Sequence, residues 1–379
     1  MPDDANFPVW FVVARSVHFM ACLLILAIFV FDRLIVPPTA QIGGDDIGPR
    51  WQRIARRLFA LAFPLALLSG AVWFAIVSVE MSGLPWREAI SGEVLGLVWN
   101  QTHFGQLWKL RALAALASLL VMPMALLDHS RKAVRAAARW AALLLAALLC
   151  GSLAWAGHGQ TGGPRAWHLA ADTVHLLVSG CWPAGLLPFA MLLVSLRRTR
   201  QTDWQPPVVL LVRRFSAMAV VSVLLLTATG VANSWFLVGS LPAVTTTSYG
   251  LVLVAKIVGF CAMVGFGAVN LLRVMPRLTA MPANSASDSV KEQAIARLLN
   301  NVVAEVILAA IVFVLVGILG MLPPPAEHHA HHHHGENAAS TIRLDELPAH
   351  SPRTLRASLS CRYGSILLIS HATVSNRWA

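Results

Sequence analysis

Residues 9–35, VWFVVARSVHFMACLLILAIFVFDRLI, decide the fold class of this chain. The run exceeds the roughly 20 apolar residues that a helix needs to cross a bilayer core. Its side chains do not alternate with a period of two, so a membrane barrel strand is not favoured. Further runs of this kind lie at about 56–79, 104–127, 138–157, 166–195, 208–236, 250–273 and 299–322. The sequence predicts an all-α polytopic membrane protein, a bundle of eight transmembrane helices.

Composition excludes other protein classes. The 379 residues are 57% hydrophobic and only 12% charged, whereas soluble domains average roughly 45–50% and 25%. A soluble enzyme, a disordered chain and a disulfide scaffold are therefore ruled out. The five cysteines form no CxxC pair, which excludes a zinc knuckle and a CxxCH haem attachment. No Walker A loop, dinucleotide fingerprint or nucleophile elbow occurs in a suitable context, so no enzymatic activity is predicted.

The net charge of +11 is a topology signal. Basic residues concentrate in every second loop and its flanks: Arg33, Arg50, Arg53, Arg56, Arg57, Arg131, Lys132, Arg135, Arg139, Arg197, Arg198, Arg200, Arg213, Arg214, Arg273, Arg277, Lys291 and Arg297. The opposite loops hold Arg87 and Arg165, or also Lys109 and Arg111 at helix flanks. Basic loops stay in the cytoplasm. We therefore expect both termini outside, with lipid and not nucleic acid as the partner.

The predicted membrane domain comprises residues 1–325, and the two ends of the chain each carry a further signal. Asp3 and Asp4 precede the first run, where a cleaved signal would carry basic residues, so we expect that helix to be retained. Residues 326–379 are predicted to form a disordered tail on the outer side of the membrane. The tail is rich in histidine: His328, His329, His331, His332, His333 and His334. A native metal-collecting role is favoured for this cluster, and an expression tag or chance is the alternative.

Ionisable groups within the spans predict function, because burying them in lipid is costly. The most informative are His168, Asp172 and His175. At 100° per residue Asp172 lies about 40° and His175 about 20° from His168, so all three share a helix face. The two imidazoles are about 10.5 Å apart along the axis. A ladder of ligands is therefore predicted rather than one ion bound by both rings.

Depth connects this face to other segments. His18 and His175 both lie about 13.5 Å from the outer end of their helices. His103, His158 and His168 would form an outer layer of ligands, with His18 and His175 facing each other below it. Met20, Cys22 and Cys181 add soft sulfur ligands, which suit Cu(I). The alternatives are ordinary ones, because histidine can be an interhelical hydrogen-bond partner and sulfur side chains commonly fill packing gaps.

Several motifs together resemble the copper resistance protein D family of bacterial inner-membrane proteins. They are Gly157-His158-Gly159, Asp172-Thr-Val-His175 with Trp182 and Gly185-Leu186, Arg214-Phe215-Ser216, Thr229-Gly230-Val-Ala-Asn233-Ser234-Trp235, Val238-Gly239-Ser240, Thr247-Ser-Tyr249-Gly250, Lys256, Asn270 and Pro276. The resemblance covers about 8–325 and is best defined over about 208–322. One departure is Trp182-Pro183-Ala184-Gly185, where a Trp-x-Gly-Gly-like turn is expected and where the proline should kink the helix.

The resemblance implies copper uptake, homeostasis and resistance, with copper ions arriving from the periplasm, where a copper-binding protein is the expected partner. The residues themselves fit a stepwise transfer from the outer histidines along His168, Asp172 and His175 toward His18. Two alternatives stay open. One is an electron-transfer protein that holds haem b between His18 and His175, because two histidines at equal depth are what bis-imidazole ligation requires. The other is a copper-binding assembly protein that transports nothing.

Overall fold

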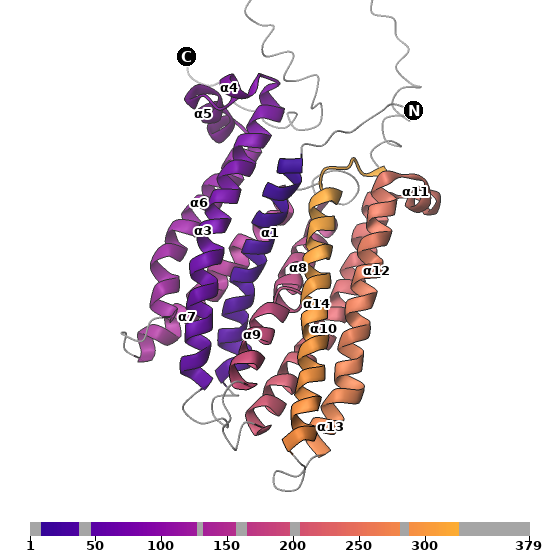
Figure 1. The fold of residues 1–379 in the computed structure, drawn as a ribbon. Coiled ribbons are helices and arrows are strands. Elements are labelled where there is room, and N and C mark those ends of the chain that lie inside the picture. Colours follow the sequence, from indigo (N-terminus) through magenta and orange to yellow (C-terminus); the bar gives the residue numbers. More distant parts are fainter. Residues whose placement is uncertain are drawn as a thin grey trace, which may run out of the picture.

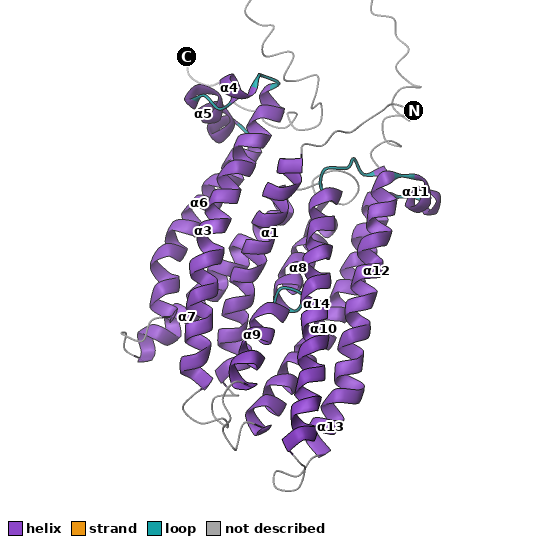
Figure 2. Ribbon diagram, viewed as in Figure 1, coloured by secondary structure: helices purple, strands orange, loops and turns teal. Residues whose placement is uncertain are grey.

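A computed structural model describes residues 9–37, 47–126, 132–156, 165–197, 205–280 and 288–325, and all regular elements in these ranges are helical (Figures 1 and 2). Eight helices in the described ranges are long and apolar enough to cross a membrane, which confirms the predicted bundle. They are built from α1 (Val9–Val30) with η1 (Phe31–Ile35), α3 (Ile47–Ser82), α6 (His103–Leu126), α7 (Lys132–Gly151) with η2 (Ser152–Ala156), α8 (Arg165–Cys181) with α9 (Leu186–Arg197), α10 (Gln205–Val238), α12 (Ser248–Val269) with η4 (Asn270–Val274) and α13 (Met275–Ala280), and α14 (Asp288–Leu319). Short helices α4 (Trp86–Ala89), α5 (Gly92–Gln101) and α11 (Leu241–Thr246) join some of them.

The helices extend beyond the apolar runs. Helix α3 begins at Ile47, well before the run that starts near residue 56, because its first turns carry basic side chains that hydropathy does not count but a helix accommodates. Glycines in the left-handed conformation follow α3 and α10: Gly83 has φ +65° and Gly239 has φ +70°. Only glycine adopts that conformation without strain, so these two residues end their helices.

Helix α1 lies at the centre of the bundle and packs against α3, α7, α8 and α14. From Phe19 to Val30 its side chains are apolar on all sides, which is typical of a helix surrounded by protein. Ala27, Ile28 and Phe29 are completely buried. Helix α12, by contrast, exposes Leu251 and Val258 and faces the surroundings of the bundle. The residues on α1 therefore meet other helices, so a polar group on α1 must find its partner inside the protein.

The fifth span is broken in its middle. Residues 182–185 form a turn between α8 and α9, which Figure 2 shows inside the bundle. Pro183 has no backbone N–H to donate, and the Ala184 N–H bonds the Ser179 carbonyl at 3.0 Å. A Cβ on Gly185 would collide with the Cys181 carbonyl oxygen, so the turn requires glycine there. The kink expected at the proline is thus a full interruption of the helix.

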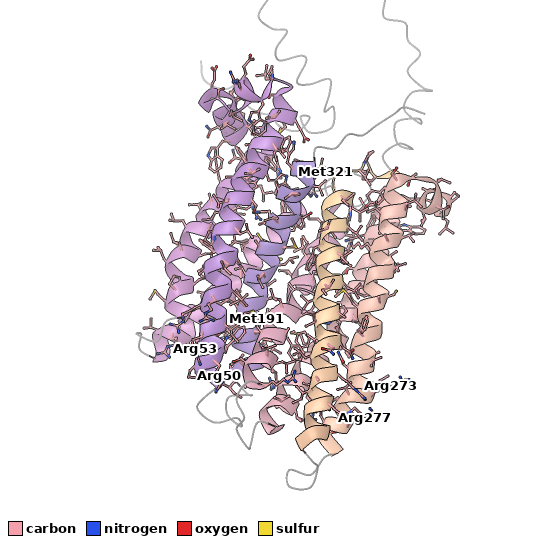
Figure 3. The ribbon with its side chains drawn as sticks, viewed as in Figure 1. Arg50, Arg53, Met191, Arg273, Arg277 and Met321 are labelled. Carbon is pink, nitrogen blue, oxygen red and sulfur yellow. The ribbon has the colours of Figure 1, made fainter. Side chains whose placement is uncertain are left out.

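The two ends of the bundle differ in charge. In Figure 3, Arg50 and Arg53 of the first half and Arg273 and Arg277 of the second half lie at one end, below called the lower end. Met321 lies at the opposite, upper end. Both halves thus carry basic residues at the same end, as the predicted topology requires. The assignment of the lower end to the cytoplasm remains a prediction.

A buried carboxylate near the lower end bonds to side chains from two other helices. Asp32, in η1, is only 2% exposed. It accepts a hydrogen bond from Trp51 Nε1 at 3.0 Å, and its other oxygen lies 3.1 Å from Arg139 Nε. A charge buried in this way is tolerated only when it is paired and hydrogen-bonded. Asp32 therefore fixes α1 against α3 and α7 and has a structural explanation.

Candidate metal-binding sites

His18 lies at the centre of a polar cluster that is otherwise surrounded by apolar helices. The side chain is 3% exposed and sits between the rings of Trp73 and Trp108, at centroid distances of 5.5 and 5.7 Å. Its Nδ1 lies 2.9 Å from the Ala66 carbonyl oxygen and 3.2 Å from Ser69 Oγ, both on α3. Because a carbonyl only accepts, Nδ1 carries the proton. The lone pair of the neutral ring is therefore on Nε2, the nitrogen through which the ring could bind a metal.

Two groups converge on that lone pair. Cys22 is one helical turn further along α1, and its Sγ lies 3.7 Å from His18 Nε2. Arg111 Nη2, from α6, lies 2.6 Å from the same nitrogen and 3.6 Å from Cys22 Sγ. Arg111 also donates from Nη1 to the Leu149 carbonyl at 2.7 Å and to Ser152 Oγ. The imidazole, the thiol and the guanidinium thus form one group of interacting side chains, below called the His18 cluster.

Arg111 is exceptional because it is a cation only 4% exposed inside the bundle. Its described neighbours provide a carbonyl, a hydroxyl, an imidazole and a thiol, but no carboxylate within ion-pair distance. Its Nε also has no described hydrogen-bond partner. A cation desolvated in this way is stabilised by any group nearby that becomes negatively charged. Cys22 is the ionisable group in its contact shell that can do so.

A cavity of about 380 Å³ adjoins the His18 cluster. His18, Cys22 and Arg111 line it together with aromatic side chains such as Trp99 and Trp108. Gly70 lets α3 approach the imidazole closely, since a Cβ at this position would lie 2.9 Å from His18 Cε1 and 3.0 Å from Trp108 Cη2. The cluster therefore has room on its open side for an incoming ion and for movement of Arg111.

The predicted face of α8 exists and is turned toward α10. His175 Nδ1 lies 2.9 Å from Thr229 Oγ1, and Asn233 Nδ2 donates to Asp172 Oδ1 at 3.2 Å. His168, 2% exposed, stacks on the ring of Phe236 at 5.0 Å. The three α8 residues and their three α10 partners follow the same one-turn spacing along antiparallel helices. We call this array the α8–α10 ladder.

Hydrogen bonding also fixes the tautomer of His175. Thr229 Oγ1 gives its single proton to the Leu225 carbonyl at 2.7 Å. The hydroxyl can then only accept from His175, so His175 Nδ1 donates and Nε2 keeps its lone pair. Elsewhere in the ladder, His168 Nδ1 and Asn233 Oδ1 are buried without a described partner. The ladder thus holds polar atoms, among them the Asn233 Oδ1 acceptor, that the described protein leaves without a partner.

The charges around the ladder differ from those around His18. The Asp172 carboxylate is in the electrostatic range of Lys256 on α12 and Arg15 on α1, and also of Tyr249. Arg15 in turn donates to the Gly320 carbonyl at 3.0 Å and lies over the Trp73 ring at 5.4 Å. Asp172 therefore has cationic neighbours from two other helices, and the ladder includes the carboxylate that the His18 cluster lacks.

The structure separates residues that the sequence analysis grouped together. His18 directs its nitrogens to α3, α6 and Cys22, whereas His175 is bonded to α10. The expected pair of rings facing each other is not what these contacts describe. Within the described ranges, no group of three or more His, Cys, Asp and Glu side chains could hold one metal ion. Any metal bound there must use two protein ligands, another donor or a rearranged site.

The remaining predicted ligands fall into two groups. His103 begins α6 and is exposed, Met20 is partly buried on α1, and Cys181 ends α8 without a described contact to the ladder histidines. His158 and the tail histidines, His328, His329, His331, His332, His333 and His334, lie outside the described residues. For all of them a ligand role stays a prediction.

Arg111 is the functional candidate that sequence analysis missed. It was counted with Lys109 as a basic residue at a helix flank. The available signal was its position eight residues into α6, where a charged side chain within a span is itself evidence of a site. Asn233 belonged to a quoted motif, but only the structure places it against Asp172. Contacts between distant helices could not be read from spacing within one helix.

Two family models match this chain, and they cover different parts of it. Residues 1–167 match the family model described as copper resistance protein D-like, N-terminal domain, and residues 209–319 match the copper resistance protein D model. The first range includes the His18 cluster and the second includes the α10 side of the ladder. Asp172 and His175 lie between the matched ranges.

Two curated relatives carry copper-related names. The chain is 35% identical over 146 residues to copper resistance protein D of Pseudomonas syringae pv. tomato, an overlap of 36% of this chain and 46% of that protein. It is 28% identical over 123 residues to the copper transport protein CutJ of Bacillus subtilis (strain 168), covering 31% of this chain and 21% of that protein. The matches thus span about half of the first relative and a fifth of the second. Family models match both halves of the membrane domain, and the first relative carries the same family name. The chain therefore belongs to the copper resistance protein D family.

Proposed function

We propose that this chain binds copper within the inner membrane and passes it from the periplasmic side during copper uptake and homeostasis. The observation that carries the proposal is the pair formed by His18 Nε2 and Cys22 Sγ, 3.7 Å apart beside a cavity inside the bundle. The copper-related names of the family and of its curated relatives support the choice of metal. Under the predicted topology, the upper end of the bundle receives the ion.

The distance between the two donors suits one soft ion. Imidazole nitrogen and thiolate sulfur bind Zn²⁺ at about 2.0 and 2.3 Å, and copper bonds are of similar length. An ion bound to both atoms of the resting pair would have a bent two-coordinate geometry, which opens further if the side chains relax. A thiolate with an imidazole favours Cu(I) over the hard cations of the cell.

Arg111 would regulate this binding because its Nη2 occupies the His18 Nε2 lone pair that the metal needs. A copper ion must displace the guanidinium from the nitrogen. The Cys22 thiol loses its proton to water when the Cu–S bond forms, so one positive charge leaves as another arrives. The net charge beside Arg111 therefore stays constant, which avoids adding a second uncompensated cation inside the membrane.

The α8–α10 ladder would be a separate station with oxygen and nitrogen donors. His175 Nε2 has its lone pair available, and the Asp172 carboxylate balances the charge of an arriving cation. His168 lies nearest the upper end, so copper would meet it first. Weak, closely spaced sites allow an ion to move on without being trapped. Asp172 and His175 are the residues on which this second part of the proposal depends.

A matched pair of cysteine variants tests the His18 cluster. Cys22→Ser keeps the side-chain shape but replaces the soft sulfur, whereas Cys261→Ser changes an exposed cysteine on α12. We expect C22S and His18→Ala to lose a Cu(I) equivalent from the purified protein and to slow copper uptake into proteoliposomes. C261S should behave like the original protein. Unchanged binding and uptake in both C22S and H18A would contradict the proposal.

The alternatives predict different outcomes of the same measurements. A copper-binding assembly protein would bind Cu(I) through Cys22 yet show no copper flux in proteoliposomes. Haem b ligation by His18 and His175 is the other alternative, in which each ring would keep its Nδ1 hydrogen bond and bind iron through Nε2. An intense Soret band in the purified protein that disappears in both H18A and His175→Ala would support haem instead.

A further inference from the structure

Glu305 is a buried acid that copper ligation does not use. It lies near the middle of the span formed by α14, about 18 Å along the helix axis from Gln293. Its side chain is 2% exposed. No cation within the described residues forms an ion pair with it. A carboxyl group in such a position is costly when ionised and alone, so its protonation state is tied to its surroundings.

A chain of amides orients the carboxyl group. Asn270 Nδ2 donates to Glu305 Oε1 at 2.9 Å, and Asn301 Nδ2 donates to Asn270 Oδ1 at 2.7 Å. Asn270 is the first residue of η4, a π-helical segment within the span. π-helical turns are rare and often occur at functional sites, because the extra residue redirects a side chain. Here the residue that begins the π-helical turn is the one that donates to the acid.

Glu305 lines a cavity of about 190 Å³ among the turn at 182–185, α9, α10, α12, η4 and α14. The cavity has room for several water molecules, and Ser216, Asn270 and Glu305 supply the polar atoms that water needs. The other lining groups, such as Phe189, Phe215 and Val264, are apolar, and the lining holds no second titratable or charged side chain. Arg273 and Arg297, on η4 and α14, are exposed at the surface. Glu305 is therefore the group in this lining that can exchange a proton.

The geometry points to Glu305 as a reversible proton-binding site, whose proton exchanges with water in the cavity beside Asn270. Protonation converts the carboxylate and one proton from water into the neutral acid, and release reverses this. The amide of Asn270 serves both forms, because Oε1 can accept its hydrogen bond in either state. The site is separate from the copper ligands and does not depend on the function proposed for them.

Infrared difference spectroscopy of the copper-free protein in membranes tests this site directly. We expect a carboxyl C=O band that appears and disappears reversibly as pH is changed. Glu305→Gln should remove the band while keeping the hydrogen bond from Asn270. The matched control is Glu80→Gln, which alters another carboxyl group of a span, on α3, and should leave the band in place. Asn270→Ala should move the band to higher frequency, since the carbonyl loses its donor.

Two results would overturn the proposal. One is a carboxyl band of full size that never responds to pH, which would make Glu305 a permanently neutral packing group. The other is a pH-dependent band that persists unchanged in E305Q, which would place the exchanging proton elsewhere. If E305Q does not fold, the response of the band to N270A alone decides, because an unmoved band would mean that Glu305 does not carry it. Copper binding by C22S and H18A is measured independently, so failure here leaves the copper proposal standing.

Discussion

The His18 cluster and the α8–α10 ladder differ in the sign of the charged group that each of them buries. The cluster has a cation, Arg111, with no carboxylate among its described partners. The ladder has a carboxylate, Asp172, with Lys256 and Arg15 in range. The metal-binding groups beside the cation are an imidazole nitrogen and a thiol sulfur, whereas those of the ladder are imidazole nitrogens and carboxylate oxygens. The comparison indicates a site for a soft ion that enters with loss of a proton and a site that tolerates an added cation directly.

The largest expected difference between the two sites is in stability, when the glycine beside each histidine is replaced by alanine. A Cβ at Gly70 would lie 2.9 Å from His18 Cε1, whereas one at Gly230 would lie 3.8 Å from His175 Cε1. His18 is held by hydrogen bonds and two indole rings, so it cannot yield easily. We expect Gly70→Ala to be less stable than Gly230→Ala by about 1–3 kcal/mol in free energy of unfolding. Unfolding of both variants, followed by intrinsic fluorescence, measures it.

Equal stability of G70A and G230A would mean that His18 is free to move, and the His18 cluster would then not be a preformed site. Gly230→Ala is a suitable control because alanine is favoured over glycine inside a helix and meets only ordinary contacts at this position.

The second difference concerns the cation that competes for the His18 lone pair. Arg111→Gln removes the charge and weakens the donor to His18 Nε2. Since a hydrogen bond from a charged group contributes about 1.5–3 kcal/mol, we expect the Cu(I) affinity of the cluster to rise at least about tenfold. Competition with a Cu(I) chelator measures this. Lys256→Gln, the matched change beside Asp172, should not raise affinity at the cluster. A weaker Cu(I) affinity in R111Q would show that Arg111 supports binding instead of opposing it.

The smallest expected difference concerns the number of acceptors that the Nδ1–H group of each imidazole has. His175 Nδ1 has Thr229 as its described acceptor, whereas His18 Nδ1 has both the Ala66 carbonyl and Ser69. Thr229→Val should therefore cost about 1 kcal/mol of stability through one unsatisfied N–H. Ser69→Ala should cost less, since the carbonyl remains. Thermal unfolding of the two variants ranks them. The reverse order would mean that Ser69, not Ala66, fixes the His18 tautomer.

Sequence patterns predicted the helices well because a membrane span is a local property. Each apolar run needs only its own length to cross a bilayer, and each must satisfy its backbone within itself as a helix. The grouping of His168, Asp172 and His175 on one face was also predictable, since helix geometry fixes it and the structure turns that face to α10. The extent of the break at Trp182–Gly185 was not, although Pro183 indicated its position.

The partners of those residues were not predictable from local patterns. Equal depth suggested that His18 and His175 share a site, but depth fixes only one coordinate, and the rotation of each helix about its axis decides which neighbour a side chain meets. Arg111 is a second residue whose partner could not be predicted from the sequence. Its charge was visible in the sequence, and its contact with His18 depends on the packing of α6 beside α1 and α3.

The sequence by itself determined that this chain is an eight-helix membrane protein, and its motifs carried the likeness to the copper resistance protein D family. Those features depend on the length, composition and order of segments. Only the tertiary structure decided that an arginine occupies the lone pair of His18, that α10 partners the α8 face, and that an amide chain holds Glu305 beside a cavity. The physical reason is that hydrogen bonds and charge pairing act over a few ångströms, between helices whose relative rotation no single segment encodes.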